Sequence, residues 1–154
     1  MFYIGIDPGK TGGIAWILSG EEKAYGFSKL EGMTEHDTWQ LLAKLEPGVC
    51  VMEKVHAGPS MGSSAAFKFG KSFGALHMAV ICAGLQVEMV SPQKWQKEFG
   101  LLVKGRGFGQ GDTEKKNRNK VKAQELFPAI KITHAIADAL LIAMYCKRMA
   151  ADLF

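Results

Sequence analysis

Apolar residues along this 154-residue chain fall into two kinds of pattern. Short apolar or alternating stretches bounded by glycine, proline or serine predict β-strands over residues 2–7, 14–18, 23–27, 49–55 and 86–90. Longer stretches, in which apolar side chains recur every three or four positions, predict helices over residues 34–45, 64–85, 92–99, 113–127 and 134–149. Between residues 104 and 111 glycine occupies every second position, which predicts a loop.

The order of these elements predicts the fold class. The first three strands follow one another through short turns that contain glycine, so we expect them to be antiparallel. The later strands alternate with helices, which is typical of parallel strands joined by crossovers. We therefore predict an α/β fold with a mixed sheet, three antiparallel strands followed by two parallel ones, and helices on both faces. At this length and without an internal linker, we expect residues 1–154 to form one domain.

The composition excludes several classes of protein. With 47% hydrophobic and 22% charged residues, the chain is unlike an intrinsically disordered one. The longest apolar runs, which His77 and Asp138 interrupt, are shorter than a membrane-spanning helix requires. The first residues contain neither a basic segment nor a signal cleavage pattern, and the three cysteines lie far apart in apolar surroundings. We therefore expect a cytoplasmic protein whose cysteines are reduced core residues.

Positive charge is concentrated in one segment. The net charge is +4, and residues 104–122 contain seven basic and two acidic side chains, so this segment carries all of the excess. Such a segment is either a solvated helix face or an arm that binds a polyanion, in which case its affinity falls as salt concentration rises. The charge pattern by itself leaves both interpretations open.

Three acidic residues and a histidine occur where charge is unexpected. Asp7 ends the first predicted strand, where a buried carboxylate is costly unless it is paired, hydrated or bound to a metal. Glu53 interrupts an apolar central strand, although glutamate is rarely buried without a partner. Asp138 lies in an apolar helix, and His134 precedes it by four residues, so the two side chains share one helix face.

Each of these residues has an ordinary structural explanation: a turn cap for Asp7, a lysine partner for Glu53 and a place near the helix cap for His134. Together, however, they offer a set of hard oxygen donors, without the cysteine and histidine ligands that favour zinc. Such a set suits Mg²⁺ or Mn²⁺. Two such ions about 4 Å apart activate water and stabilise the leaving oxygen in phosphodiester cleavage.

The residues around these positions resemble the motifs of a known family, the RuvC-type Holliday junction resolvases of the RNase H-like superfamily. The match covers nearly the whole chain in the family's order, and its later motifs are similar to those of phage-type members. The segments that carry the resemblance are 4–15 (IGIDPGKTGGIA), 51–55 (VMEKV), 64–75 (SAAFKFGKSFGA), 90–97 (VSPQKWQK), 125–128 (ELFP) and 134–143 (HAIADALLIA).

This resemblance implies a homodimeric, metal-dependent endonuclease that cleaves branched DNA, with one active site for each strand. It assigns Asp7, Glu53 and Asp138 to the three family acids, as ligands of two Mg²⁺ ions per site, and Mn²⁺ is expected to support activity as well. Bacterial members commonly place a fourth ligand three residues before the last acid, where this chain has Ala135. His134 is the nearest capable side chain, as a metal ligand or a general base. The phage-type motifs favour a phage or prophage origin, and hence the cytoplasm of a bacterium or of a phage host.

The resemblance also implies DNA contacts from two regions. In the family the loop after the second acid wedges or stacks at the junction centre, and here His56, Met61 and Phe67 are the candidates. The helical spacing of Phe67, Phe69 and Phe73, however, favours a core or dimer-interface position. The basic side chains that we expect to grip the phosphates are Lys104, Arg106, Lys115, Lys116, Arg118 and Lys120.

Two other functions remain open from the sequence. Residues 7–11 (DPGKT) also resemble the first phosphate motif of actin-like and sugar-kinase-like ATP-binding proteins, which share the RNase H-like core. Those proteins need two such domains, and this chain has room for one. The other alternative is a branched-DNA-binding module without catalysis, against which the presence of all three acids argues. Titration of Mg²⁺ with and without ATP separates strand cleavage, ATP hydrolysis and neither.

Overall fold

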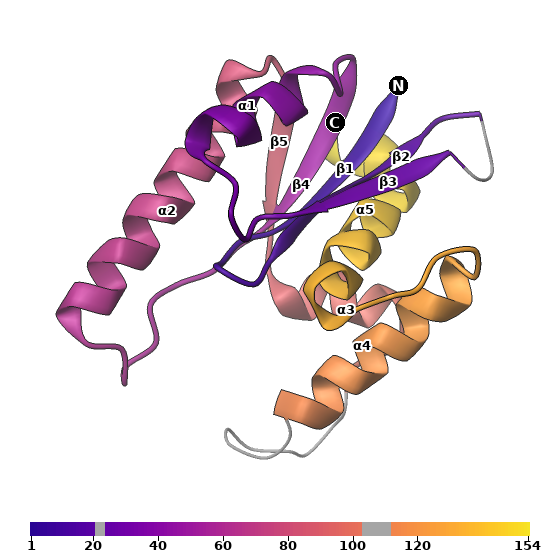
Figure 1. Ribbon diagram of the computed structural model, residues 1–154. Helices are drawn as coiled ribbons and strands as arrows, with labels where there is room; N and C mark the ends of the chain where they lie inside the picture. Colours follow the sequence, from indigo (N-terminus) through magenta and orange to yellow (C-terminus); the bar gives the residue numbers. More distant parts are fainter. Residues whose placement is uncertain (21–23, 103–111) are drawn as a thin grey trace.

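A five-stranded mixed sheet forms the centre of the molecule (Figure 1). The computed structural model describes residues 1–20, 24–102 and 112–154. The strands lie in the order β3-β2-β1-β4-β5; β1 pairs antiparallel with β2, β2 antiparallel with β3, β1 parallel with β4, and β4 parallel with β5. The predicted mixed sheet is therefore confirmed. The strand bounds are β1 Phe2–Asp7, β2 Gly13–Leu18, β3 Tyr25–Lys29, β4 Gly48–Glu53 and β5 Gln86–Val90.

The strand ends differ from the predictions where pairing, not local pattern, decides them. The third strand continues to Lys29 instead of ending at residue 27, because Ser28 and Lys29 pair with Ile14 and Gly13 of β2; its predicted start at residue 23 lies outside the described residues. The fourth strand ends at Glu53 instead of residue 55: Lys54 still donates a backbone hydrogen bond to Val90, and β5 ends there. The two strands thus stop together, which fixes Glu53 at the edge of the sheet.

Helices cover both faces of the sheet, as predicted (Figure 1). α1 and α2 lie on one face and α5 on the other, while α3 and α4 pack against α5. Among the residues that the structure describes, no helix combines the length and apolar character needed to cross a membrane. The helix bounds are α1 Glu35–Ala43, α2 Ser63–Cys82, α3 Pro92–Glu98, α4 Asp112–Leu126 and α5 His134–Leu153.

The start of α1 is specified locally. The backbone N–H of Asp37 donates to Oγ1 of Thr34 at 3.1 Å, and the backbone N–H of Thr34 donates to Oδ2 of Asp37 at 3.0 Å. This reciprocal pair is a capping box, in which two otherwise unpaired backbone donors are satisfied. The three-residue spacing of Thr34 and Asp37 in the sequence is what makes this pairing possible.

Two hydrophobic cores lie on the two faces of the sheet. Side chains alternate along β1, so Ile4 and Ile6 pack towards α1 and α2, whereas Tyr3 and Gly5 face α5. The cysteine prediction holds in part: all three are free, and Cys50 and Cys146 are buried, but Cys82 is exposed. Its assignment to the core is wrong because the last turn of α2 presents this side chain to solvent.

Candidate active site

Asp7 and Glu53 lie at the ends of neighbouring parallel strands. In the β1–β4 register Ile6 is opposite Met52, so the next residue of each strand is one of the two acids. Ile6 and Met52 belong to the core under α1 and α2, and alternation therefore turns both carboxylates towards α5. The carboxyl ends of parallel strands are where open α/β sheets usually bind their ligands.

α5 brings a third acid to the same edge of the sheet. Gly5 lies so close to α5 that a Cβ added to it would overlap the backbone of Ala139 and Ala143. Small residues on both sides therefore let the helix approach the sheet closely. Asp138, one residue before Ala139, is held near enough to Asp7 and Glu53 for its charge to act on both. The name acid cluster is used below for Asp7, Glu53 and Asp138.

Burial and mutual repulsion make the acid cluster hard to ionise. Burial, followed by the negative charges of Asp138 and Glu53, raises the pKa of Asp7 from 3.8 to about 8. Burial and the charge of Asp138 raise the pKa of Glu53, and burial raises the pKa of Asp138. Asp7 and Glu53 are within hydrogen-bonding reach of each other, and this contact adds to the rise in the pKa of Asp7. Strongly raised pKa values in a group of this kind are typical of functional sites.

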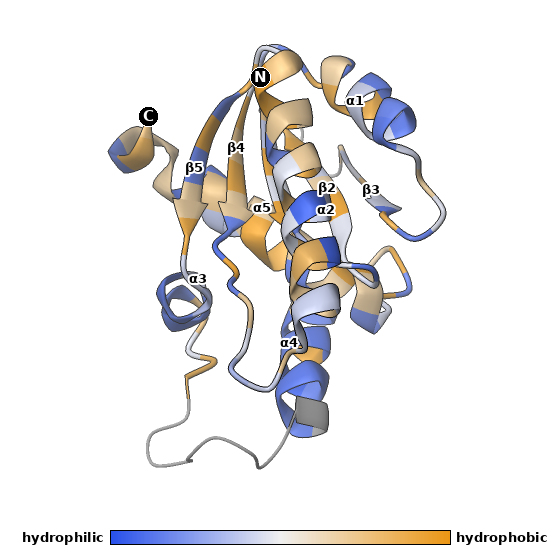
Figure 2. Cartoon of the chain, turned by 90° about the vertical axis from the view of Figure 1, so that its left-hand side faces the viewer, coloured by the Kyte–Doolittle hydropathy of each residue, from blue (hydrophilic) through white to orange (hydrophobic). Residues whose placement is uncertain are grey.

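Lys115 opposes the negative charge of the acid cluster from α4. Its ammonium group acts to lower the pKa of each of the three acids, and Lys116 adds to this effect at Asp138. Lys115 is half-buried, and Figure 2 shows α4 largely in hydrophilic colours, alongside the apolar α5. The basic helix predicted from the charge pattern therefore packs with its first turns next to the acids.

Two neutral hydrogen-bond donors hold two of the acids. Nε1 of Trp95, a fully buried residue of α3, donates to Oε1 of Glu53 at 3.4 Å. Nδ2 of Asn119, a residue of α4 that is 1% exposed, donates to Oδ1 of Asp138 at 2.8 Å. Neither residue was assigned a role from the sequence. A signal existed for Asn119, because asparagine is unfavourable inside a helix and this one lies four residues after Lys115, on the same helix face.

The donor chemistry of the acid cluster fits a hard divalent cation. All three side chains offer carboxylate oxygens, the ligands that Mg²⁺ and Mn²⁺ prefer. Burial is the first cause of their raised pKa values, so the protein around them solvates their negative charge poorly, and a bound cation would stabilise it. Across residues 1–20, 24–102 and 112–154, no three His, Cys, Asp or Glu side chains are arranged as a ready metal site. The fit therefore rests on the chemistry of the three carboxylates, and water or a substrate phosphate would have to contribute further oxygens.

The other predicted site residues surround the acid cluster at different distances. His134 is the first residue of α5 and is exposed. The charge of His134 acts to lower the pKa of Asp138, by less than the hydrogen bond from Asn119 and the charges of Lys115 and Lys116 do. Lys104 and Arg106 lie outside the described residues. Arg118 and Lys120 are half-buried on α4.

The loop candidates lie beyond the end of β4. His56 and Met61 are exposed in the segment between β4 and α2. Phe67 is 75% exposed on α2, so the core alternative is wrong for this residue, while the dimer-interface alternative stays a prediction. Phe69 and Phe73 are four residues apart and share the half-buried face of α2, whereas Phe67 lies on another side of the helix.

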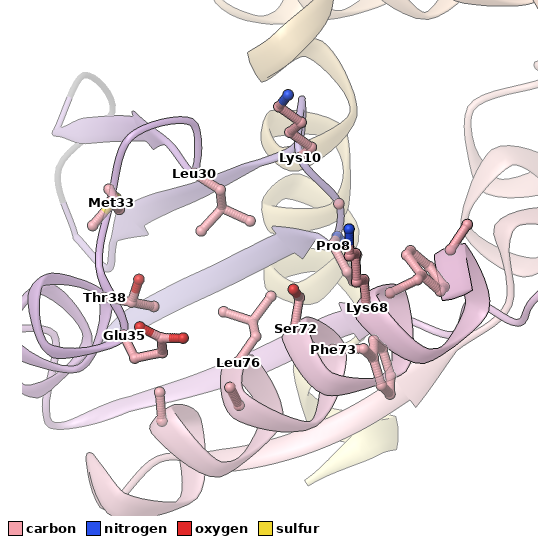
Figure 3. Close-up of a pocket in the computed structure, with 15 residues that line it drawn as sticks. Pro8, Lys10, Leu30, Met33, Glu35, Thr38, Lys68, Ser72, Phe73 and Leu76 are labelled. Carbon is pink, nitrogen blue, oxygen red and sulfur yellow. The ribbon is translucent and has the colours of Figure 1, made fainter. Parts of the chain in front are cut away.

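A cavity of about 630 Å³ lies on the opposite face of the sheet, between α1, α2 and the turn after β1 (Figure 3). Its walls are mostly apolar and include Phe73, and the two lysines that line it are Lys10 and Lys68. Pro8 and Gly9, which follow Asp7 in the chain, line the cavity, but none of the three acids does. It is therefore an apolar groove beside the acidic site, separate from it.

Comparison with known proteins agrees with this architecture. No protein-family model and no curated protein sequence matches the chain. Its structure is similar to that of Thermus thermophilus RuvC, with a TM-score of 0.66 and 19% sequence identity over 99% of this chain and 96% of that one. It is also similar to T. thermophilus RuvC in complex with a Holliday junction substrate, with a TM-score of 0.68 and 17% identity over 99% and 96% of the two chains. The resemblance predicted from the motifs is thus confirmed for the fold, which is that of RuvC.

Proposed function

We propose that this protein is a divalent-metal-dependent endonuclease that cleaves Holliday junctions or other branched DNA as a homodimer. The observation that carries this proposal is the convergence of Asp7, Glu53 and Asp138 at one edge of the sheet, next to a basic helix. The fold supports it as well, since a structural neighbour, T. thermophilus RuvC, binds a Holliday junction substrate.

In this proposal the acid cluster holds two Mg²⁺ ions, or Mn²⁺ in their place. Bound there, the ions would supply an activated water and neutralise the charge that develops on the scissile phosphate. Asp7 and Glu53 contribute from strand ends, which hold their carboxylates rigidly, and Asp138 contributes from α5. Ligands from the sheet and from the helix would then hold the ions together.

Lys115 and His134 complete the proposed reaction centre. Lys115 already lies within electrostatic reach of all three acids, so its ammonium can stabilise negative charge on a phosphate held beside them. His134 is exposed at the start of α5, four residues before Asp138. From the rim of the site it acts either as a further ligand or as the base that accepts a proton from the attacking water.

DNA binding is assigned to side chains on either side of the reaction centre. Phe67 is the strongest candidate for a group that stacks at the junction centre, because a phenylalanine that is 75% exposed has apolar surface to bury. His56 and Met61 are exposed in the preceding loop and remain candidates for the same role. The basic residues proposed to hold the phosphates are Lys104, Arg106, Lys115, Lys116, Arg118 and Lys120.

The test is a cleavage assay on a labelled four-way junction, with linear duplex of the same sequence as the control, in Mg²⁺, Mn²⁺ or EDTA. We expect paired symmetric nicks on the junction only when metal is present. Equal cutting of flaps or duplex would retain the nuclease and remove the junction specificity. Tight junction binding without cleavage in any metal would contradict the proposal and favour a DNA-binding module.

The proposed role of α4 is tested by salt dependence. Simultaneous replacement of Lys115, Lys116 and Arg118 by glutamine should weaken junction binding and lower the slope of log affinity against log salt by roughly two to three. Binding is measured in EDTA, so that cleavage does not intervene. An unchanged slope would show that this helix face is solvated and makes no phosphate contact.

A further inference from the structure

Asn119 occupies the point where α4 meets the acid cluster. Its side chain is 1% exposed, and its Nδ2 donates to Oδ1 of Asp138 at 2.8 Å. Lys115 lies one turn earlier and Ala123 one turn later, so the three share the inner face of the helix. Along this face the environment changes from buried and apolar at Ala123 to charged at Lys115.

An asparagine at this position has a cost that packing does not explain. Its Oδ1 is buried and has no hydrogen-bond partner among the described residues. A buried acceptor without a partner is unfavourable, and asparagine is also a poor residue for a helix interior. An apolar side chain of similar size would join α4 to α5 without either cost. Residues that break such local rules are expected at functional sites.

Hydrogen-bonding chemistry explains why an asparagine occupies this position. The partner of Nδ2 is a carboxylate of the acid cluster, and an amide can donate to it without adding charge. A lysine here would compete with a cation for Asp138, and an aspartate would repel it. Groups that bind a metal ligand from behind orient that ligand, and their loss commonly weakens metal binding or activity about 10- to 100-fold.

We propose that Asn119 is a positioning residue of the active site, which holds the Asp138 carboxylate towards Asp7 and Glu53 and leaves its own Oδ1 as an acceptor inside the site. This inference rests on the proposed nuclease function. Asn119 does not itself touch the reacting atoms in this assignment. It acts through Asp138, in the way that Trp95 contacts Glu53 on the other side of the cluster.

The test compares Asn119→Leu with Asn117→Leu. Asn117 is exposed on the same helix, so it provides a matched control with the same change of residue. Four quantities are measured: the melting temperature, junction affinity in EDTA, the affinity of the free protein for Mn²⁺ by electron paramagnetic resonance, and the metal concentration that gives half-maximal cleavage. We expect Asn119→Leu to weaken Mn²⁺ binding about 10-fold or more and to raise the half-maximal metal concentration similarly. Junction affinity in EDTA and all properties of Asn117→Leu should stay within about twofold of the unmodified protein.

Several outcomes would overturn the inference. Unchanged Mn²⁺ affinity in a folded Asn119→Leu protein would show that Asn119 serves only to join the two helices. If this variant does not fold, Asn119→Ser decides, because serine is smaller and its hydroxyl does not reach Asp138; normal Mn²⁺ affinity in it would have the same meaning. If the unmodified protein cleaves no branched DNA, the proposed function fails, and the Mn²⁺ titration still tests Asn119 by itself.

Discussion

The two longest helices, α2 and α5, have 20 residues each and lie on opposite faces of the sheet, but they are anchored very differently. α5 has nine buried residues distributed from its first turn to its fourth, whereas α2 has three, all in its second half. Phe67, in the first half of α2, is 75% exposed. The two helices therefore have equal length but unequal burial: α5 is packed against the sheet and holds Asp138 in place, while the first half of α2 has no fully buried residue.

The largest expected effect on stability comes from a change at Gly5, where β1 contacts α5. Gly5→Ala adds a Cβ that would overlap the backbone of Ala139 and Ala143, so α5 must move away from β1. Overpacking of this kind costs about 3 kcal/mol, and we expect the melting temperature to fall by roughly 6–12 °C. Thermal unfolding followed by circular dichroism measures this. A variant as stable as the unmodified protein would mean that the close contact with Gly5 does not fix α5 against the sheet.

The next expected effect is on cleavage and concerns Asp138, the acid that α5 contributes. Asp138→Asn keeps the shape of the side chain and removes its charge, so we expect cleavage to fall on the order of 1000-fold. Junction binding in EDTA should persist, because the basic residues are unchanged. Asp152→Asn, at an exposed position of the same helix, is the control and should cleave normally. Efficient cleavage by the Asp138 variant would remove this residue from the active site.

The stability of the protein should depend on pH through Asp7, which lies on the face of the sheet that α5 covers. Asp7 has a pKa of about 8 in the folded protein and an ordinary value of 3.8, so between these values the folded state binds more protons than the unfolded state. The free energy of unfolding of the metal-free protein should therefore fall as pH rises from about 4 to 8. The melting temperature in EDTA should be several degrees lower at pH 8.5 than at pH 6. Asp7→Asn should flatten this difference, and a variant with the same pH dependence would contradict the assignment.

The smallest expected effect is a gain in stability, from a substitution in α2. Gly74 lies inside the helix with open space where a Cβ would be. Gly74→Ala should therefore raise stability by about 0.5–1 kcal/mol, because alanine loses less backbone entropy in a helix. Denaturant unfolding at low protein concentration measures it. A loss of stability instead would show that this face of α2 is covered in solution, for example by a second copy of the chain. The two helices would then differ less in burial.

Sequence patterns predicted what depends on local order. Strand β1, the capping box of Thr34 and Asp37, and the placement of Asp7 at a strand end all follow from spacing along the chain. The convergence of Glu53 and Asp138 with Asp7 was also expected, from their unusual apolar surroundings and from the family motifs.

Roles that depend on packing between distant helices could not be predicted in this way. Trp95 and Asn119 contact the acids only because α3 and α4 fold back against α5. Nothing in their own segments specifies those partners. The exposure of Phe67 has a different reason: only Phe69 and Phe73 have the four-residue spacing that places two side chains on one helix face, and Phe67 lies on another side of the helix.

The three acids come from positions 7, 53 and 138, so they meet only after most of the chain has folded. During ribosomal synthesis a nascent chain that ends before α5 contains two of the acids and no third. Because contacts so distant in sequence form late in folding, a fragment or a partly unfolded molecule has no complete acid cluster. An unfinished chain therefore lacks the acid cluster on which the proposed nuclease activity depends.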